Sequence, residues 1–223
     1  MIRSNLLRAG LLASLILTGF CVRSETAIEG RVNLPAAEPP AVSTSRYAGQ
    51  DAVCDPPDAP IAAIYLEGRF PAWATNTPPG TNEIWQIGMQ FRPALLPVRA
   101  GSTVVFPNGD NFYHNVFSYS RPKRFDLGRY RKDDQPAAEV FDKPGVVKLY
   151  CDIHQNMRGV ILVLDTPFFT RTDSNGVFHL PKLPAGTYKL TAWADEKHFA
   201  EKSVEIETGK TLHVDFDLTQ SRR

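Results

Sequence analysis

Residues 151–157 read Cys-Asp-Ile-His-Gln-Asn-Met, so three metal-binding side chains fall within one short segment. Cys151, His154 and Met157 supply a thiolate, an imidazole and a thioether, which can reach one ion if the segment forms a tight turn. One cysteine, two histidines and a weakly bound methionine are the ligands of blue-copper sites. The segment therefore predicts a copper site that needs one more histidine, and His114 is the upstream candidate.

Each of these residue types also has a common structural role. A cysteine is often a small buried hydrophobe and a methionine often fills a core, while a histidine can lie on a loop or a strand edge. Zinc is a second candidate metal, but methionine is a poor zinc ligand and structural zinc sites use several thiolates or imidazoles. The spacing of the C-x-x-H-x-x-M motif favours copper over both alternatives.

Most of the chain outside this motif has the pattern of short strands. Its segments are β-branched or aromatic and are separated by glycine, proline, asparagine and aspartate. The segments are 104–106, 115–119, 146–151, 160–164, 188–193, 203–206 and 212–218. This pattern predicts an all-β protein made of sandwiches or Greek-key barrels.

Alternation along residues 147–151 places the cysteine on a buried face. Cys151 and the apolar residues of this strand share one side, and the polar residues share the other. The next strand begins near residue 160, so we expect His154 and Met157 on the loop between the two strands. A strand end and a short loop would fix the ligand geometry before any metal binds.

The upstream ligand candidate has a similar setting. His114 follows a polar stretch, residues 108–113, and begins a predicted strand. We expect Asn115 to hydrogen-bond across to the loop of His154, as groups behind metal ligands often do. The densest basic run, residues 121–132, predicts a solvated loop, with docking of an acidic redox partner as its alternative role.

Three further histidines have no metal-site spacing. His179 and His213 alternate with apolar neighbours, so we expect both on the solvated outer faces of strands. His198 lies in a charged segment that predicts a surface turn.

The first residues predict export. Residues 1–24 carry Arg3 and Arg8, then an apolar run, then small and polar residues, which is typical of a secretory signal peptide. No later segment has about 18 consecutive apolar residues, so no transmembrane segment is expected in the mature chain. The formal net charge of +1 offers no electrostatic basis for nucleic-acid or membrane binding.

Two cysteines remain after removal of the predicted signal peptide, Cys54 and Cys151. A disulfide between them would consume the thiolate that copper needs. We therefore expect Cys54 to be a free thiol, with a bridge to another chain as the alternative.

No motif for hydrolysis or for c-type haem is present, because the sequence lacks G-x-S-x-G, H-E-x-x-H and C-x-x-C-H. A copper oxidase or a nitrite-reductase-like enzyme would need further copper centres, and the chain has 5 histidines in all. We therefore do not expect an enzyme.

Four segments together resemble the cupredoxins, especially the amicyanin and plastocyanin group. They are Gly101-Ser-Thr-Val-Val-Phe-Pro-Asn, His114-Asn115-Val116, Phe141-Asp-Lys-Pro-Gly145 and the 151–157 motif. Residues 84–168 are more closely similar to the secreted bacterial proteins called methylamine utilization proteins. The resemblance implies one type 1 (blue) copper ion held by His114, Cys151, His154 and Met157.

The same resemblance implies electron transfer in the bacterial periplasm with a redox protein partner, whose identity the sequence leaves open. The alternative is periplasmic copper binding or delivery without a redox circuit. Gln155 and Asn156 stand where small carriers often have proline or aromatic residues, so the motif does not predict an apolar docking patch.

A second resemblance covers the C-terminal part of the chain. Residues 172–180 and 183–193 are similar to the carboxypeptidase regulatory-like domain, a transthyretin-type β-sandwich. Two opening strands of that domain are missing before residue 172, but residues 28–32 and 61–67 fit their pattern.

We therefore expect a discontinuous sandwich, residues 28–70 plus 166–223, into which a cupredoxin domain of residues 83–165 is inserted. Residues 35–60 and 73–81 lack periodicity and predict long loops. The second sandwich is expected to be an interaction or structural module, and the oligomeric state is left open.

Overall fold

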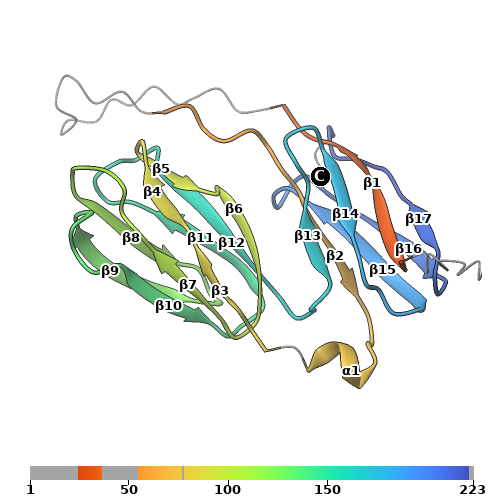
Figure 1. Ribbon diagram of the computed structural model, residues 1–223. Helices are drawn as coiled ribbons and strands as arrows, with labels where there is room; N and C mark the ends of the chain where they lie inside the picture. The colour runs from red at the N-terminus through yellow and green to blue at the C-terminus, as the bar shows by residue number, and fades with distance from the viewer. Residues whose placement is uncertain (1–24, 37–54, 77, 221–223) are drawn as a thin grey trace, which may run out of the picture.

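Two β-sandwiches lie side by side in the computed structural model, which describes residues 25–36, 55–76 and 78–220 (Figure 1). Strands dominate, and the one helix among these residues is the single turn α1 (Ala72–Thr75). The predicted all-β fold class with two sandwiches is confirmed.

The first sandwich is built from the middle of the chain. One sheet has, in order, β6 (Leu95–Arg99), β12 (Arg158–Leu164), β11 (Gly145–Tyr150), β8 (His114–Tyr119) and β9 (Arg124–Tyr130). The facing sheet has β10 (Ala137–Phe141), β7 (Ser102–Phe106) and β3 (Thr81–Glu83), and a separate hairpin joins β4 (Trp85–Ile87) to β5 (Gln90–Arg92). Alternate side chains point between the sheets, where Phe106, Leu149 and Ile161 are fully buried.

The second sandwich combines strands from both ends of the chain. One sheet has, in order, β14 (Val177–Leu180), β1 (Ala27–Asn33) and β17 (Thr211–His213), with β18 (Phe216–Asp217) also pairing with β1. The other has β13 (Phe169–Arg171), β2 (Ala63–Glu67), β15 (Gly186–Trp193) and β16 (Phe199–Ile206). Ile28 lies opposite Leu180, and Ile64 lies opposite Ala192. Both N-terminal strands therefore complete sheets whose other strands come from the C-terminal part.

A third hydrophobic cluster joins the two sandwiches. Leu162 and Leu164 of β12 pack there with Ala63 of β2 and Trp193 of β15. The intervening residues of β12, such as Ile161, face the core of the first sandwich. Strand β12 is therefore apolar on both faces, and the two sandwiches pack against each other through their sheets.

Polar contacts add to this junction. Lys148 Nζ on β11 lies 2.5 Å from Glu196 Oε2, which follows β15. Arg99 at the end of β6 donates from Nη2 to the carbonyl oxygen of Thr75 in α1, at 2.6 Å.

Three sequence expectations differ from the structure. The basic segment expected as a loop contains β9, because Phe125 and Leu127 pack against the first core while the residues that alternate with them are exposed. The strand expected over 212–218 is divided into β17 and β18. The loop expected over 73–81 includes most of α1.

Some expectations fall outside the part of the chain that the structure describes, namely the signal peptide of residues 1–24 and the state of Cys54. Within the described ranges, no helix is both long enough and apolar enough to cross a membrane.

We expect Trp193→Ala to destabilise the protein by about 3–5 kcal/mol, because the side chain is 7% exposed within the joining cluster and its loss leaves a cavity. The measurement is urea unfolding followed by far-UV circular dichroism. Trp73→Ala is the matched control, since Trp73 is 65% exposed and should change stability by less than about 0.5 kcal/mol. Equal unfolding midpoints for the two variants would contradict the packed junction.

Candidate metal centre

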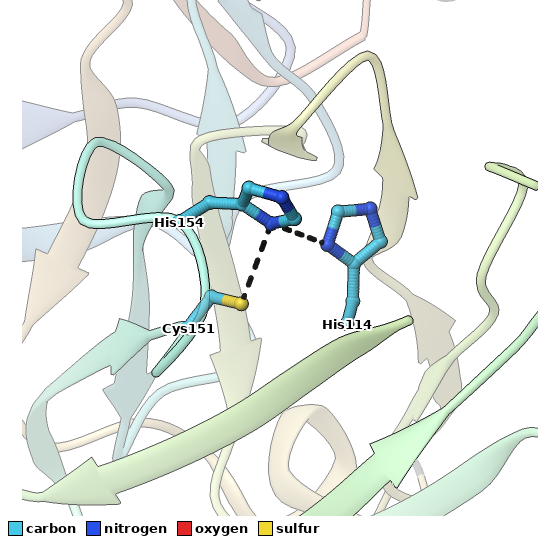
Figure 2. A group of neighbouring side chains, drawn as sticks. All are labelled: His114, Cys151 and His154. Atoms are coloured by element: carbon cyan, nitrogen blue, oxygen red, sulfur yellow. Dashed lines mark hydrogen bonds between the residues drawn. The ribbon is translucent and has the colours of Figure 1, made fainter. Parts of the chain in front are cut away.

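Three of the four predicted ligands meet at one end of the first sandwich (Figure 2). His114 is the first residue of β8, Cys151 directly follows β11, and His154 lies on the loop that leads to β12. The Nδ1 atoms of the two imidazoles are 3.1 Å apart, and Cys151 Sγ is 3.8 Å from His154 Nδ1. All three donor atoms lie within 4.8 Å of one another.

This donor set fits a single metal ion. Bonds of about 2.0–2.1 Å to nitrogen and about 2.3 Å to sulfur place neighbouring ligand atoms roughly 3–4 Å apart. The two measured separations fall in that range. One thiolate with two imidazoles is a soft, nitrogen-rich set, which suits copper better than magnesium or calcium.

Met157 lies three residues beyond His154 on the same loop. Its side chain is fully buried in the core of the first sandwich. Its backbone N–H donates to the carbonyl oxygen of His154 at 2.9 Å, which closes the tight turn expected from the motif. The role of its thioether as a fourth ligand stays a prediction.

A carboxylate that the sequence reasoning missed holds the first imidazole. Asp110 Oδ2 lies 2.8 Å from His114 Nε2, and the same carboxylate accepts bonds from the backbone N–H groups of Gly88 and Met89 at 2.9 and 3.1 Å. When Nε2–H donates to Asp110, the Nδ1 atom of His114 keeps its lone pair and is free to bind a metal. The signal available in the sequence was an acidic residue four positions before the histidine.

Burial sets the protonation of the two imidazoles. It lowers the pKa of His114, although hydrogen bonding and charge attraction from Asp110 oppose this. It also lowers the pKa of His154, and the neighbouring His114 adds to that effect. Burial opposes ionisation of Asp110, but bonds from Gly88, His114 and Met89 hold the pKa of that carboxyl below its usual value. At neutral pH the site presents neutral imidazoles, the form that binds metals.

An aromatic ring covers both imidazoles from the preceding loop. The centroid of Phe112 is 5.1 Å from that of His114 and 5.6 Å from that of His154, each in an edge-to-face arrangement. The ring is 38% exposed, so it forms part of the protein surface beside the site. The motif with Gln155 and Asn156 did not predict an apolar surface here, because Phe112 comes from a different loop.

The ligand loop is tied to the sheet by a contact that differs from the one expected. Asn115 Nδ2 donates to Asp126 on β9 at 2.7 Å rather than to the loop of His154. Instead, Arg129 on β9 donates from Nε and Nη2 to Asp152 Oδ2 at 3.0 and 2.7 Å. Asp152 directly follows Cys151, so one of the basic residues expected to be solvated anchors the ligand loop.

Comparison with known proteins gives a sequence relative that matches part of the chain. Over 107 residues the chain is 28% identical to amicyanin-alpha of Methylorubrum extorquens, a match that covers 47% of this chain and 86% of that protein.

Two solved structures are also similar. A purple cupredoxin from Nitrosopumilus maritimus is 25% identical, covers 37% of this chain and 99% of its own, and has a TM-score of 0.34. A copper-containing nitrite reductase from Thermus scotoductus is 27% identical with a TM-score of 0.35. That match covers 37% of this chain but 22% of the reductase chain.

The C-terminal part matches the carboxypeptidase regulatory-like domain family over residues 158–219. The first residues of this match form β12, which pairs with β11 and β6 of the first sandwich. The sequence match therefore begins one strand before β13, the first strand of the C-terminal part that belongs to the second sandwich.

We expect the metal-free protein to lose stability as the pH falls below 6.5, the ordinary histidine pKa. Because the folded-state pKa values of His114 and His154 are lowered, the unfolded chain binds more protons there, and stability rises with pH. The slope is at most about 1.4 kcal/mol per pH unit for each imidazole. Urea unfolding at several pH values between about 7 and 5 measures how the free energy of unfolding changes with pH. This range lies around the ordinary histidine pKa.

His114→Gln and His154→Gln should each flatten this pH dependence. His198→Gln, in the second sandwich, is the control for the loss of an imidazole outside the site. The same slope in all three variants would show that the two imidazoles are not its source.

Proposed function

We propose that the chain combines a cupredoxin domain with a carboxypeptidase regulatory-like domain, and that it is a type 1 copper protein that transfers electrons. The observation that carries the proposal is the convergence of Cys151, His114 and His154 with donor atoms within 4.8 Å. Copper bound there would supply one-electron redox chemistry. Amicyanin-alpha, the relative named above, lends support because 86% of its length matches part of this chain.

Each residue of the site has a defined task in this proposal. Cys151 provides the thiolate, and its position at a strand end, with 6% exposure, keeps water from the sulfur. His114 and His154 provide Nδ1 atoms, and Asp110 orients the first of them. Met157 provides the buried thioether as the weak fourth ligand.

The surroundings favour a site whose geometry is set by the protein. His114 is fully buried and bound to Asp110, and the loop of His154 is anchored through Asp152 to Arg129. Ligands held in this way need little rearrangement when an electron is gained or lost. Phe112 lies against both imidazole rings and shields them partly from solvent. We propose that an electron leaves through His154 to a redox protein that docks beside Phe112.

We propose the domain division 83–165 for the cupredoxin and 28–70 plus 166–223 for the second sandwich. The pairing of β1 and β2 with C-terminal strands supports the discontinuous arrangement. We further propose export to the bacterial periplasm with residues 1–24 as the signal peptide, and no enzymatic activity. The second sandwich acts in this proposal as an interaction or structural module.

We expect the full chain loaded with copper to show one intense visible absorption band from the bond between thiolate and Cu(II). Cys151→Ala should abolish the band, because no other group at the site can replace the thiolate. Cys54→Ala is the matched control and should keep the band. Absorption spectra at a copper content verified by elemental analysis make the measurement. A colourless protein at full copper occupancy would rule out a type 1 site.

The same preparation separates electron transfer from copper delivery. A reversible one-electron couple in voltammetry, with copper retained through repeated cycles, supports the carrier. Loss of Cu(I) to a chelator within the time of one cycle would favour delivery instead.

We expect Met157→Leu to keep the visible band and to raise the reduction potential. Replacing the thioether by a hydrocarbon makes the buried site less polar, which favours the lower charge of Cu(I). Each tenfold change in the ratio of the two copper affinities corresponds to about 59 mV. Met89→Leu is the control, because Met89 is also buried, at 3% exposure, but is not a proposed ligand. An unchanged potential in Met157→Leu would remove Met157 from the ligand set.

A further inference from the structure

Two histidines flank one glutamate on adjacent strands of the second sandwich. Glu29 on β1 lies directly opposite His179 on β14 and directly opposite His213 on β17. His179 Nδ1 is 3.7 Å from Glu29 Oε2, and His213 Nε2 is 3.3 Å from Glu29 Oε1. The carboxylate therefore has one oxygen toward each imidazole. We call these three residues the His-Glu-His row.

The row faces solvent on the outer side of its sheet. Ile28 and Leu180, the neighbours of Glu29 and His179, point inward to the second core. The side chains of Glu29, His179 and His213 are 41%, 53% and 75% exposed. In Figure 1, β1, β14 and β17 lie on the side of the molecule away from the first sandwich, so the row is separate from the copper-type centre.

The backbone fixes the register that creates the row. The N–H of Val214, next to His213, donates to the carbonyl oxygen of Glu29 at 2.9 Å. Gly30 allows this approach, because a Cβ at that position would come within 2.0 Å of the carbonyl oxygen of Val214. The two strands are therefore held close together at the point where the imidazole and the carboxylate meet.

We propose that the His-Glu-His row binds a divalent cation of borderline softness, such as Zn²⁺ or Cu²⁺. Two imidazoles and one carboxylate are a common ligand set for these ions. In this structure the two imidazoles flank the carboxylate from opposite sides, each 3.3 or 3.7 Å from its own oxygen of Glu29, so both rings must turn toward each other to share one ion. Exposed side chains change rotamer freely, so both rings can turn toward one ion above the carboxylate.

The charged side chains near the row are compatible with a bound cation. Arg31, two residues along β1 from Glu29, donates from Nη1 to the carbonyl oxygen of Asn175 at 3.0 Å, so its guanidinium is held at the turn before β14. Asp215, beyond His213, accepts from the backbone N–H of Arg31 at 2.7 Å. The site adds a metal-binding role in the second sandwich and does not depend on the proposed electron transfer.

The test is a calorimetric titration of the full chain, already loaded with one equivalent of copper, with ZnCl₂. The wild type should bind one further Zn²⁺. The double variant H179Q/H213Q should bind it at least about tenfold more weakly, as expected when imidazole ligands are removed. His198→Gln removes the remaining histidine of the second sandwich, which lies outside the row, and should bind as the wild type does.

A second titration separates this site from the copper-type centre. Cys151→Ala combined with His114→Gln and His154→Gln removes the thiolate and both imidazoles of that centre and should leave the zinc affinity of the row unchanged, so a failure of the copper proposal would not affect the outcome. Circular dichroism confirms that each variant is folded. No zinc uptake by the copper-loaded wild type, or equal zinc affinity in the wild type and H179Q/H213Q, would overturn the proposal.

Discussion

Strand β12 contributes side chains to two hydrophobic environments at once. Ile161 and Val163 face the core of the first sandwich, while Leu162 and Leu164 face the cluster that joins the two sandwiches. A strand apolar on both faces cannot lie at a solvated surface, so a second layer must cover it. The sheet of β2 and β15 supplies that layer. The position of the second sandwich thus follows from the composition of one strand, and the same strand pairs with β11, whose end presents Cys151.

The sequence predicted the fold class and the inward direction of Cys151 because both depend on local alternation. It did not predict β9, since charged residues there mask the half-buried Phe125 and Leu127. The contact between the sandwiches was also missed. An apolar run such as 160–164 indicates burial on both faces but does not say whether a sheet of the same domain or of another covers it.

The metal-ligand set shows the same difference between features that local sequence predicts and contacts that depend on the whole fold. The C-x-x-H-x-x-M spacing was local and pointed to Cys151 and His154, which the structure brings together with His114. The groups that position these ligands come from other loops and strands. Asp110 and Arg129 act through side-chain directions and loop shape, which sequence periodicity does not encode. A residue's partner across two loops is a property of the folded chain.

The split strand order bears on how the molecule assembles. One cavity is lined by Pro78, Pro79, Gly80 and Asn82 together with Pro167 and Phe169, so the chain enters and leaves the first sandwich at neighbouring points. Once that sandwich has folded, β2 and β13 are already close together. Most of the entropy cost of closing the long loop between them has then been met. Strands β14 and β17 both pair with β1, so the slot between them is filled only when β1 lies there. At high concentration β1 of a second molecule competes for that slot, which makes reciprocal strand exchange the expected misassembly of this protein.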